Sequence, residues 1–301
     1  MNARTDTRPM GLIKGMSFED YHAVEAFSAT GMRLLSRSPW HFKNRVPTVP
    51  TRPMLNGSLA HCAILEPDAM AQRYIVVPED APKRPTEAQW NAKKSNESSQ
   101  IAKEWWTAFG EEAAGKIIVR AEDYAVTRAQ LAAVAADPEI SGYLASGYSE
   151  ASVFWIDEAT GVYCKARPDW VHELDERRVV LMDLKSTQDE SPEGFGRTTA
   201  RMGYHRQAAH YTAGFEKVTG LRVERFVFAA VSSALPVLAV PLLLPEDFAE
   251  QGRDEVRELL ALYARCQQTD VWPSYGTGCL EMSIPAYANR SNEIEVSYAD
   301  A

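Results

Sequence analysis

The sequence has few cysteines, and none of them lie close together. Its four cysteines are Cys62, Cys164, Cys266 and Cys279, with no Cys-x-x-Cys pair among them. This spacing excludes a disulfide framework and a zinc knuckle, and it predicts reduced thiols that are mostly buried. The sequence also lacks the clustered cysteines that ligate an iron–sulfur cluster, so we expect no such cluster.

Long apolar runs are absent as well. Residues 1–20 carry charges but no apolar core of the kind that signal peptides have, and no later stretch approaches the ~18 apolar residues of a membrane span. We therefore expect a cytoplasmic protein with no membrane partner.

The chain has no excess of positive charge. Its 301 residues include 32 Lys and Arg against 41 Asp and Glu, a formal net charge of −9. Such a total argues against a simple basic nucleic-acid binder. The charges are unevenly distributed, however: residues 27–65 carry five basic residues and no acid, residues 194–213 three arginines and no acid, and residues 221–301 a local charge of −6. Phosphate-binding charge is a property of a face, so nucleic acid stays open as a partner.

What is present is a globular composition, with 45% hydrophobic and 10% aromatic residues, which excludes a disordered chain. Apolar periodicity predicts a mainly helical part over 1–145 and a part with strands over 146–301, together forming one compact unit. Residues 78–104, rich in Pro, Lys, Glu, Ser and Asn, predict a solvated, mobile insertion.

The predicted elements can be given by their ranges. Helices are expected from Ser28 or Thr30 to Pro39, and over 57–65, 121–136, 192–219 and 245–268; strands are expected over 152–157, 162–170, 179–185, 224–231 and 236–244. Strands mixed with covering helices indicate an α/β fold whose central mixed sheet contains both hairpins and a crossover.

Two of these strands end in charged residues where a core strand should stay apolar. Arg167-Pro168-Asp169 closes one strand, and Asp183-Leu184-Lys185 closes the next. Residues i and i+2 of a strand share a face, so Asp183 and Lys185 emerge side by side, and a neighbouring strand can bring Asp169 beside them. Converging carboxylates can hold Mg²⁺, and a lysine nearby can act on an attacking water. The alternative for an isolated Asp-x-Lys is a surface ion pair.

The wider context favours the first interpretation. Pro168-Asp169, thirteen further residues and then Asp183-x-Lys185 form the PD-(D/E)xK arrangement. With KARPDW, VVLMDLKST and GYHRQAAHY, and with segments between residues 17 and 285, the chain resembles the exonuclease VIII (RecE-type) group of phage and prophage recombination nucleases. This group lies in the PD-(D/E)xK superfamily with RecB-like nucleases. The resemblance implies a restriction-endonuclease-like α/β core with an N-terminal helical extension.

The resemblance also implies roles for particular residues. Asp169 and Asp183 would be the metal carboxylates, the Leu184 carbonyl a further ligand, and Lys185 the catalytic lysine. His61 matches the GxxxH motif of RecB-like members, in which the imidazole reaches the metal.

Each of these roles has a structural alternative. His61 could be a satisfied core histidine, although Gly57 on the same helical face would permit close approach to the sheet. Glu66 falls off this face and ranks as supporting at best. Glu150 could lie near the metal, but a solvated strand start is the simpler interpretation.

DNA contacts are expected on both sides of the metal site. Gln207 and Tyr211 match the QxxxY motif that is usually assigned to substrate contacts, although a Gln–Tyr pair that packs a helix is the alternative. The other substrate-binding candidates are Arg167, Thr187, Arg201, Tyr204 and Arg206. Trp40, Phe42, Tyr204 and His205 could stack on unpaired bases. Arg197 could equally belong to a solvated helix face.

These features predict a Mg²⁺-dependent exodeoxyribonuclease, with Mn²⁺ able to substitute, that degrades one strand of double-stranded DNA from a free end. The resemblance implies 5′ to 3′ polarity, a single-strand annealing protein as partner, a role in recombination and repair, and a homo-oligomer that could be ring-shaped. The alternatives are an endonuclease or a flap- or RNA-acting hydrolase of the same fold, and a non-catalytic phage DNA-binding adaptor.

Overall fold

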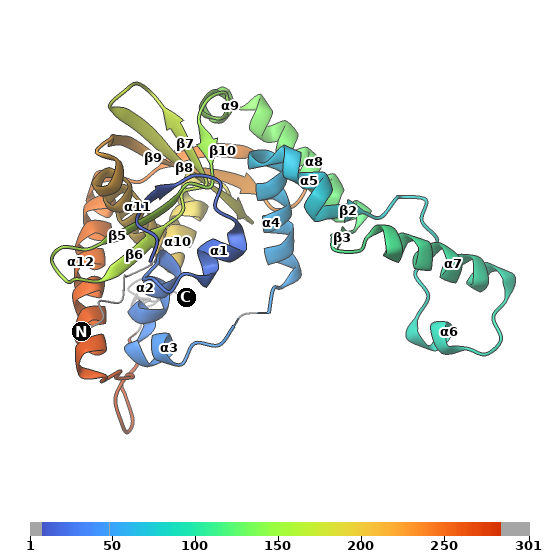
Figure 1. Cartoon of the computed structure of the whole chain (residues 1–301), viewed down its shortest axis with the longest axis horizontal. Coiled ribbons are helices and arrows are strands. Elements are labelled where there is room, and N and C mark those ends of the chain that lie inside the picture. The colour runs from blue at the N-terminus through green and yellow to red at the C-terminus, as the bar shows by residue number, and fades with distance from the viewer. Residues whose placement is uncertain (1–7, 48, 284–301) are drawn as a thin grey trace, which may run out of the picture.

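The chain folds around a five-stranded mixed sheet (Figure 1), as seen in a computed structural model that describes residues 8–47 and 49–283. The strand order is β10-β9-β8-β7-β4. The strands are β4 (Tyr148–Ser149), β7 (Trp170–Glu173), β8 (Arg178–Thr187), β9 (Arg222–Ser232) and β10 (Ala239–Leu243). Strands β8 and β9 run parallel and the other pairs are antiparallel. A crossover and hairpins in one sheet confirm the predicted α/β class.

A second sheet of three strands lies beside the first. Its order is β1-β5-β6, with β1 (Gly11–Ile13), β5 (Ser152–Ile156) and β6 (Tyr163–Ala166). The single strand predicted over 162–170 is therefore wrong: it is β6 in one sheet followed by β7 in the other. Pro168 lies at the corner, where it has no N–H to donate to a strand ladder. The corner places Asp169 between the two sheets.

The crossover from β8 to β9 consists of two helices rather than the single helix predicted over 192–219. Helix α10 (Pro192–Met202) is capped by Ser191, and α11 (Tyr204–Thr219) ends at Gly220 as expected. Gly203 separates them with a left-handed backbone, φ +73°, and a Cβ there would lie 2.3 Å from the Arg206 guanidinium. Helix α11 packs on β5 and β6 and against α12 (Glu246–Thr269).

The N-terminal helices lie on both sides of the sheet. They are α1 (Phe18–Ala23), α2 (Ala29–Arg37), α3 (Pro39–Lys43), α4 (Arg52–Leu65), α5 (Pro67–Arg73), α8 (Ala121–Ala136) and α9 (Pro138–Leu144). Helices α4, α8 and α9 contact the five-stranded sheet, whereas α2 packs against α11 and α12. Ser28 caps α2, which settles the predicted choice between Ser28 and Thr30. Helix α4 begins at Arg52, earlier than the predicted Gly57, with Pro53 in its first turn.

The N-terminal part and the strand-rich part share one hydrophobic core. Phe27 and Leu35 are buried in the same cluster as Val153, Leu181 and Phe215. The ends of the two predicted parts, residues 1–7 and 284–301, lie outside the described residues. Three cysteines are buried and Cys279 is exposed, as expected, and all four are free. Among residues 8–47 and 49–283, no helix is long and apolar enough to cross a bilayer.

Residues 74–119 form an arm that projects from the body (Figure 1). The arm contains β2 (Tyr74–Val76), α6 (Glu87–Asn91), α7 (Glu97–Glu112) and β3 (Ile117–Val119), and β2 pairs in parallel with β3 at its base. The loop predicted over 78–104 is thus folded. A capping box of Thr86 and Gln89 starts α6, and Asn96 caps α7.

Candidate active site

Strand β8 carries the acid and the lysine of the Asp-x-Lys motif. Asp183 is 1% exposed and is the one acidic side chain within a strand that is otherwise apolar from Val179 to Leu184. One carboxylate oxygen, Oδ1, accepts a hydrogen bond of 2.6 Å from Gln207 Nε2 on α11. The other, Oδ2, forms an ion pair with Lys185 but accepts no hydrogen bond of good geometry. A buried carboxylate oxygen without a donor is costly unless a cation faces it.

The second carboxylate reaches the same place from the corner between β6 and β7. Asp169 Oδ2 accepts a hydrogen bond of 2.7 Å from the Leu184 backbone N–H. Burial raises the pKa of Asp169 well above its usual value, and the nearby Asp183 carboxylate raises it further. The structure therefore brings both predicted carboxylates together, close enough for their charges to repel.

Helix α4 adds the imidazole of His61. Its Nε2 lies 2.8 Å from the Leu184 carbonyl oxygen, and because a carbonyl can only accept, this nitrogen carries the proton. Burial lowers the pKa of His61, and Lys185 lowers it further, so the ring is neutral. The unprotonated Nδ1 then faces Asp169 Oδ2 at 3.6 Å. Two acceptors facing each other at this distance call for a proton or a cation between them.

Glu150 lies in the same cluster. One ligand atom each from His61, Glu150 and Asp169 lie within 4.8 Å of one another. Glu150 has a left-handed backbone, φ 55°, and its N–H donates to the Asp169 carbonyl at 3.0 Å. Such a backbone is uncommon for a residue other than glycine and is found at sites that the surrounding structure constrains. Sequence reasoning ranked Glu150 as a solvated strand start, and it missed this placement.

Arg167 is enclosed rather than open to a substrate. Its side chain is 9% exposed and forms an ion pair with Glu150. The guanidinium also donates to Ser152 Oγ at 3.2 Å and to the carbonyls of Met16 at 3.0 Å and Ser17 at 3.2 Å. These contacts place Arg167 behind Glu150, where it joins the N-terminal segment to the site.

Lys185 lies at the open side of the carboxylates. Burial lowers the pKa of Lys185, but the charges of Asp183 and Asp169 raise it, and the net shift is upward. The ammonium group therefore stays protonated. It also lies over the ring of Tyr204, 4.8 Å from the ring centroid. Phe195 and Phe228 contact the same ring and fix its place.

The QxxxY pair lies on α11 with its polar atoms turned towards β8. Gln207 bridges the Asp183 carboxylate and the Tyr211 hydroxyl, and burial raises the pKa of Tyr211 well above its usual value. Both sequence interpretations of this pair are therefore compatible with its position, since it packs the helix and also touches an acid of the site.

Other candidates lie away from the carboxylates. Thr187 Oγ1 donates to the Asp189 carbonyl at 3.0 Å, and Arg201 is exposed at the end of α10. Glu66 pairs with Arg73, and Arg197 pairs with Glu193, so both fit the structural alternatives. Of the residues considered for base stacking, Trp40 is exposed, whereas Phe42 and His205 are buried.

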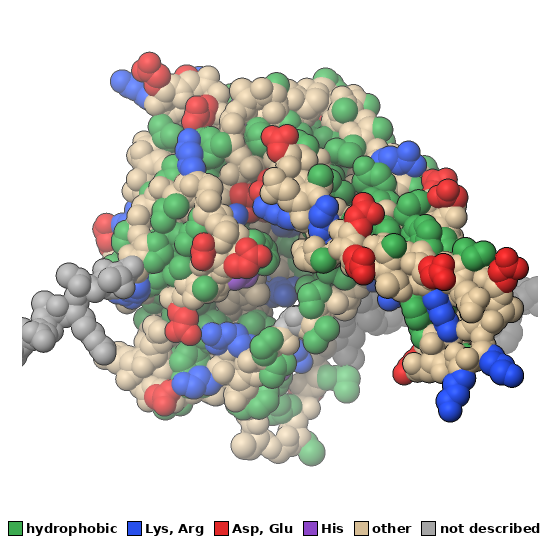
Figure 2. Space-filling model, turned by 45° about the vertical axis from the view of Figure 1, so that its right-hand side comes forward, with side chains coloured by type: hydrophobic (Ala, Val, Ile, Leu, Met, Phe, Trp, Pro, Cys, Tyr) green, Lys and Arg blue, Asp and Glu red, His purple; other side chains and the backbone are tan. Residues whose placement is uncertain are grey.

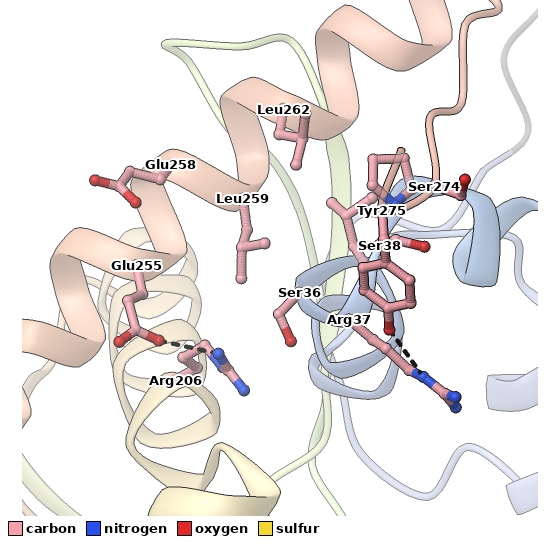
Figure 3. A pocket seen from close by; sticks show the side chains of 12 residues that line it. Ser36, Arg37, Ser38, Arg206, Glu255, Glu258, Leu259, Leu262, Ser274 and Tyr275 are labelled. Atoms are coloured by element: carbon pink, nitrogen blue, oxygen red, sulfur yellow. Dashed lines mark hydrogen bonds and ion pairs between the residues drawn. The ribbon is translucent and has the colours of Figure 1, made fainter. Parts of the chain in front are cut away.

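Arg206 borders a separate pocket of about 430 Å³ between α2, α11 and α12 (Figure 3). Its guanidinium donates to Glu255 at 3.0 Å, and on another wall Arg37 donates to the Tyr275 hydroxyl at 3.3 Å. Arg206 immediately precedes Gln207 on α11, so the two side chains point about 100° apart, and neither Asp169 nor Asp183 lines the pocket. The pocket is therefore separate from the carboxylate site.

Basic and acidic side chains are interspersed over the face shown in Figure 2. The exposed cations of the segment 27–65 include Arg33 and Arg37 on α2 and Lys43 on α3. Lys43 pairs with Asp270, and Arg52 pairs with Glu122 and Asp123, so the acid-free segment is partly neutralised by acids from elsewhere in the chain.

A mixed sheet with an acid and a lysine on one strand, and a second acid at the corner before the neighbouring strand, defines the PD-(D/E)xK class of folds. The sequence matches the family described as "PDDEXK-like domain of unknown function (DUF3799)" over residues 28–283, and the chain belongs to that family. This confirms the predicted superfamily. The match to the RecE-type group stays a prediction.

A solved structure shows the same fold. The crystal structure of a candidate exonuclease from Eubacterium rectale is similar with a TM-score of 0.55 and 12% sequence identity, over 93% of this chain and 100% of that chain. At this identity the likeness concerns the fold. No curated protein matches the sequence.

Proposed function

We propose that this chain is a metal-dependent nuclease and, more specifically, a Mg²⁺-dependent exodeoxyribonuclease that degrades one strand of duplex DNA from an end. The observation that carries the proposal is the convergence of Asp169, Asp183, Lys185, His61 and the Leu184 carbonyl, which come from three separate parts of the chain. The family and the fold support a nuclease. The 5′ to 3′ polarity rests on the sequence resemblance.

The donor set fits a hard divalent cation. Asp183 Oδ2 faces the Lys185 ammonium but accepts no hydrogen bond of good geometry, and His61 Nδ1 and Asp169 Oδ2 face each other as two acceptors. Asp169, Asp183, the Leu184 carbonyl and His61 would hold the ion, with Glu150 available as a further carboxylate. Mn²⁺ accepts both oxygen and imidazole ligands and would substitute. When bound, the ion would supply positive charge at the scissile phosphate and a more acidic water.

The chain's own residues account for the remaining chemistry. Lys185, which stays protonated, is placed to donate to a phosphate oxygen or to orient the attacking water. Gln207 holds the Asp183 carboxylate in place through Oδ1 and leaves Oδ2 free of hydrogen bonds. Neutral His61 keeps its Nδ1 lone pair directed at the same space.

The proposed partners follow from the resemblance to recombination exonucleases. The substrate would be double-stranded DNA with a free end, and the exposed single strand would pass to a single-strand annealing protein. A homo-oligomer, including a ring around DNA, belongs to the same proposal. The exposed arginines of α2 and the end of α10 would supply phosphate contacts near the site.

Digestion of linear and covalently closed DNA tests the proposal. With Mg²⁺, the wild-type protein should digest an end-labelled linear duplex, leave a closed circle intact, and stop when the metal is chelated. Labels placed on the 5′ or the 3′ end report polarity. Cleavage of the circle would favour an endonuclease, and cleavage of RNA or flap substrates would favour those alternatives. Binding without metal-dependent products would leave only a DNA-binding adaptor.

A further inference from the structure

The arm, residues 74–119, has a core of its own. Ala102, Phe109 and Ala113 are buried, and Trp105 and Trp106 form ring contacts with Phe109. The arm is joined to the body through β2 and β3, and α6 lies at its outer end (Figure 1). These aromatic contacts therefore give the projecting arm a defined shape.

The outer end of the arm is basic. We define the arm tip as residues 82–95, which contain Lys83, Arg84, Lys93 and Lys94 against the single acid Glu87. All four cations are exposed. Within the described part of the chain, the three lysines form no ion pair. Basic side chains that no acid neutralises are available to an external anion.

The tip packs on one face of α7. Trp106 Nε1 donates to the Pro82 carbonyl at 2.8 Å, and Lys103 Nζ donates to Ser95 Oγ at 2.7 Å, so both ends of the tip are tied to the helix. Arg84 lies over the Trp106 ring, 5.3 Å from its centroid. The backbone of the tip is thus held in place on α7, and its basic side chains extend from there.

Three acids of the arm lie on the opposite face of α7. Glu97, Glu104 and Glu111 follow one another at seven-residue spacing, which places them in one stripe along the helix. Ala102 precedes Glu104 by two residues, or about 200° of rotation, so the buried face and the acidic stripe are opposed. The arm therefore has a basic side, formed by the tip, and an acidic side.

We propose that the arm tip binds the phosphate backbone of duplex DNA at a distance from the candidate active site. This inference rests on the proposed function, because it takes DNA to be the substrate. Lysines on flexible side chains suit contacts to backbone phosphates, which carry no sequence information. Trp90 on α6 lies between these lysines in the sequence and is 37% exposed, so it can pack against a deoxyribose. The acidic stripe would repel a duplex from the other side and so fix the side on which DNA lies.

Binding measurements on a triple variant test this role. Lys83→Ser, Lys93→Ser and Lys94→Ser are combined, and affinity is measured with Ca²⁺ in place of Mg²⁺ on a duplex of about 60 base pairs and on one of about 12, roughly 40 Å long. The long duplex should bind on the order of tenfold more weakly or worse, with the slope of log K against log salt reduced by about 2 to 3. The short duplex should bind within about twofold of wild type, because it offers fewer phosphates beyond those held at the candidate active site.

A matched variant controls for the loss of three positive charges. Arg177→Ser, Arg222→Ser and Arg225→Ser remove exposed arginines near the amino-terminal ends of β8 and β9, away from Asp183. This variant should keep wild-type affinity and salt slope on the long duplex. Circular dichroism of both variants verifies that they fold.

The outcomes separate this inference from the proposed function. If wild type digests linear duplex but the tip variant binds the long duplex with an unchanged salt slope, the tip inference is wrong and the nuclease proposal stands. If the tip variant changes the oligomeric state while its DNA affinity is unchanged, the tip binds a second copy of the chain and the inference is also wrong. Wild-type protein that neither binds nor digests duplex overturns both.

Discussion

Lys185 is the residue whose removal should separate catalysis from metal binding. Its ammonium lies beside Asp183 but is not itself a metal ligand. Lys185→Ala should lower the rate of digestion of end-labelled duplex by about 10²–10⁴-fold. Mn²⁺ titration of the same variant should show binding no weaker than wild type, because a competing cation has been removed. Digestion at the wild-type rate would contradict the proposed chemistry.

Arg167 should act on the metal site through Glu150. Its guanidinium pairs with Glu150 and holds the carbonyls of Met16 and Ser17. Arg167→Ala should weaken Mn²⁺ binding by about 10-fold or more, the usual effect of losing a partner that orients a ligand. Calorimetric titration measures this.

Arg197→Ala is the matched control for Arg167→Ala, since Arg197 pairs with exposed Glu193 on its own helix. It should bind Mn²⁺ as wild type does. Equal affinities of wild type and Arg167→Ala would show that Glu150 is not positioned through Arg167.

Metal binding should strengthen as the pH rises. The pKa of Asp169 is raised by burial and by Asp183, so in the metal-free fold this carboxyl keeps its proton above the usual carboxyl range. Because the folded chain holds this proton more tightly than the unfolded chain, the metal-free fold loses stability as the pH rises from the unfolded pKa of Asp169 through its folded pKa. A bound cation offsets that loss. Mg²⁺ should therefore raise the melting temperature more at pH 8 than at pH 5. An equal shift at both values would contradict this.

Most residues of the candidate site could be picked out from the sequence, because the patterns that mark them are short-range. Two acids and a lysine at strand ends follow from the alternation of side chains along a strand, and Gly57 with His61 follows from helical spacing. Glu150 had no such signal. Its place depends on the contact with Arg167 and on a left-handed backbone that glutamate rarely adopts, and neither feature is visible in the spacing.

At the scale of elements, α11 depends on a glycine at its contact with β5. A Cβ at Gly214 would lie 2.3 Å to 2.7 Å from three ring atoms of Trp155, which is 5% exposed and cannot easily move. Gly214→Ala should lower the free energy of unfolding by about 1–3 kcal/mol. Gly196→Ala on α10 meets no atom within 4 Å, and it should be neutral or stabilise by up to about 1 kcal/mol. Urea denaturation compares the two, and equal effects would contradict the packing argument.

The bounds of helices and strands were predictable where local sequence propensity agrees with the tertiary structure. The helix over 121–136 has the predicted bounds, because Ala-rich periodicity and Asp137-Pro138 act in the same direction. Helix 192–219 was predicted as continuous because a single glycine does not end a helical pattern. The break lies at Gly203, whose left-handed backbone, φ +73°, the sequence pattern does not reveal. The helices of the arm were not predicted because the many charged residues of its outer end mask the few aromatic residues that form the core beside α7.

At the scale of the whole molecule, the net charge of −9 limits where DNA can lie. The acids of α12 and of the α7 stripe lie on faces other than the arm tip, and α2 supplies exposed arginines. Part of the acidic stretch 221–301 lies outside the described residues, because the described part ends at 283. A substrate path that runs from the active site towards the arm tip agrees with this distribution, and an even coating of DNA over the surface does not.

The central claim, that Asp169 and Asp183 hold one divalent cation beside Lys185, can be tested by anomalous diffraction from crystals soaked in Mn²⁺. The account predicts a peak bound by both carboxylates and by the Leu184 carbonyl, with His61 or Glu150 beside it. Carboxylates more than about 10 Å apart, too far to share one ion at contacts of about 2.0–2.1 Å, or a soaked crystal with no peak between them, would contradict it.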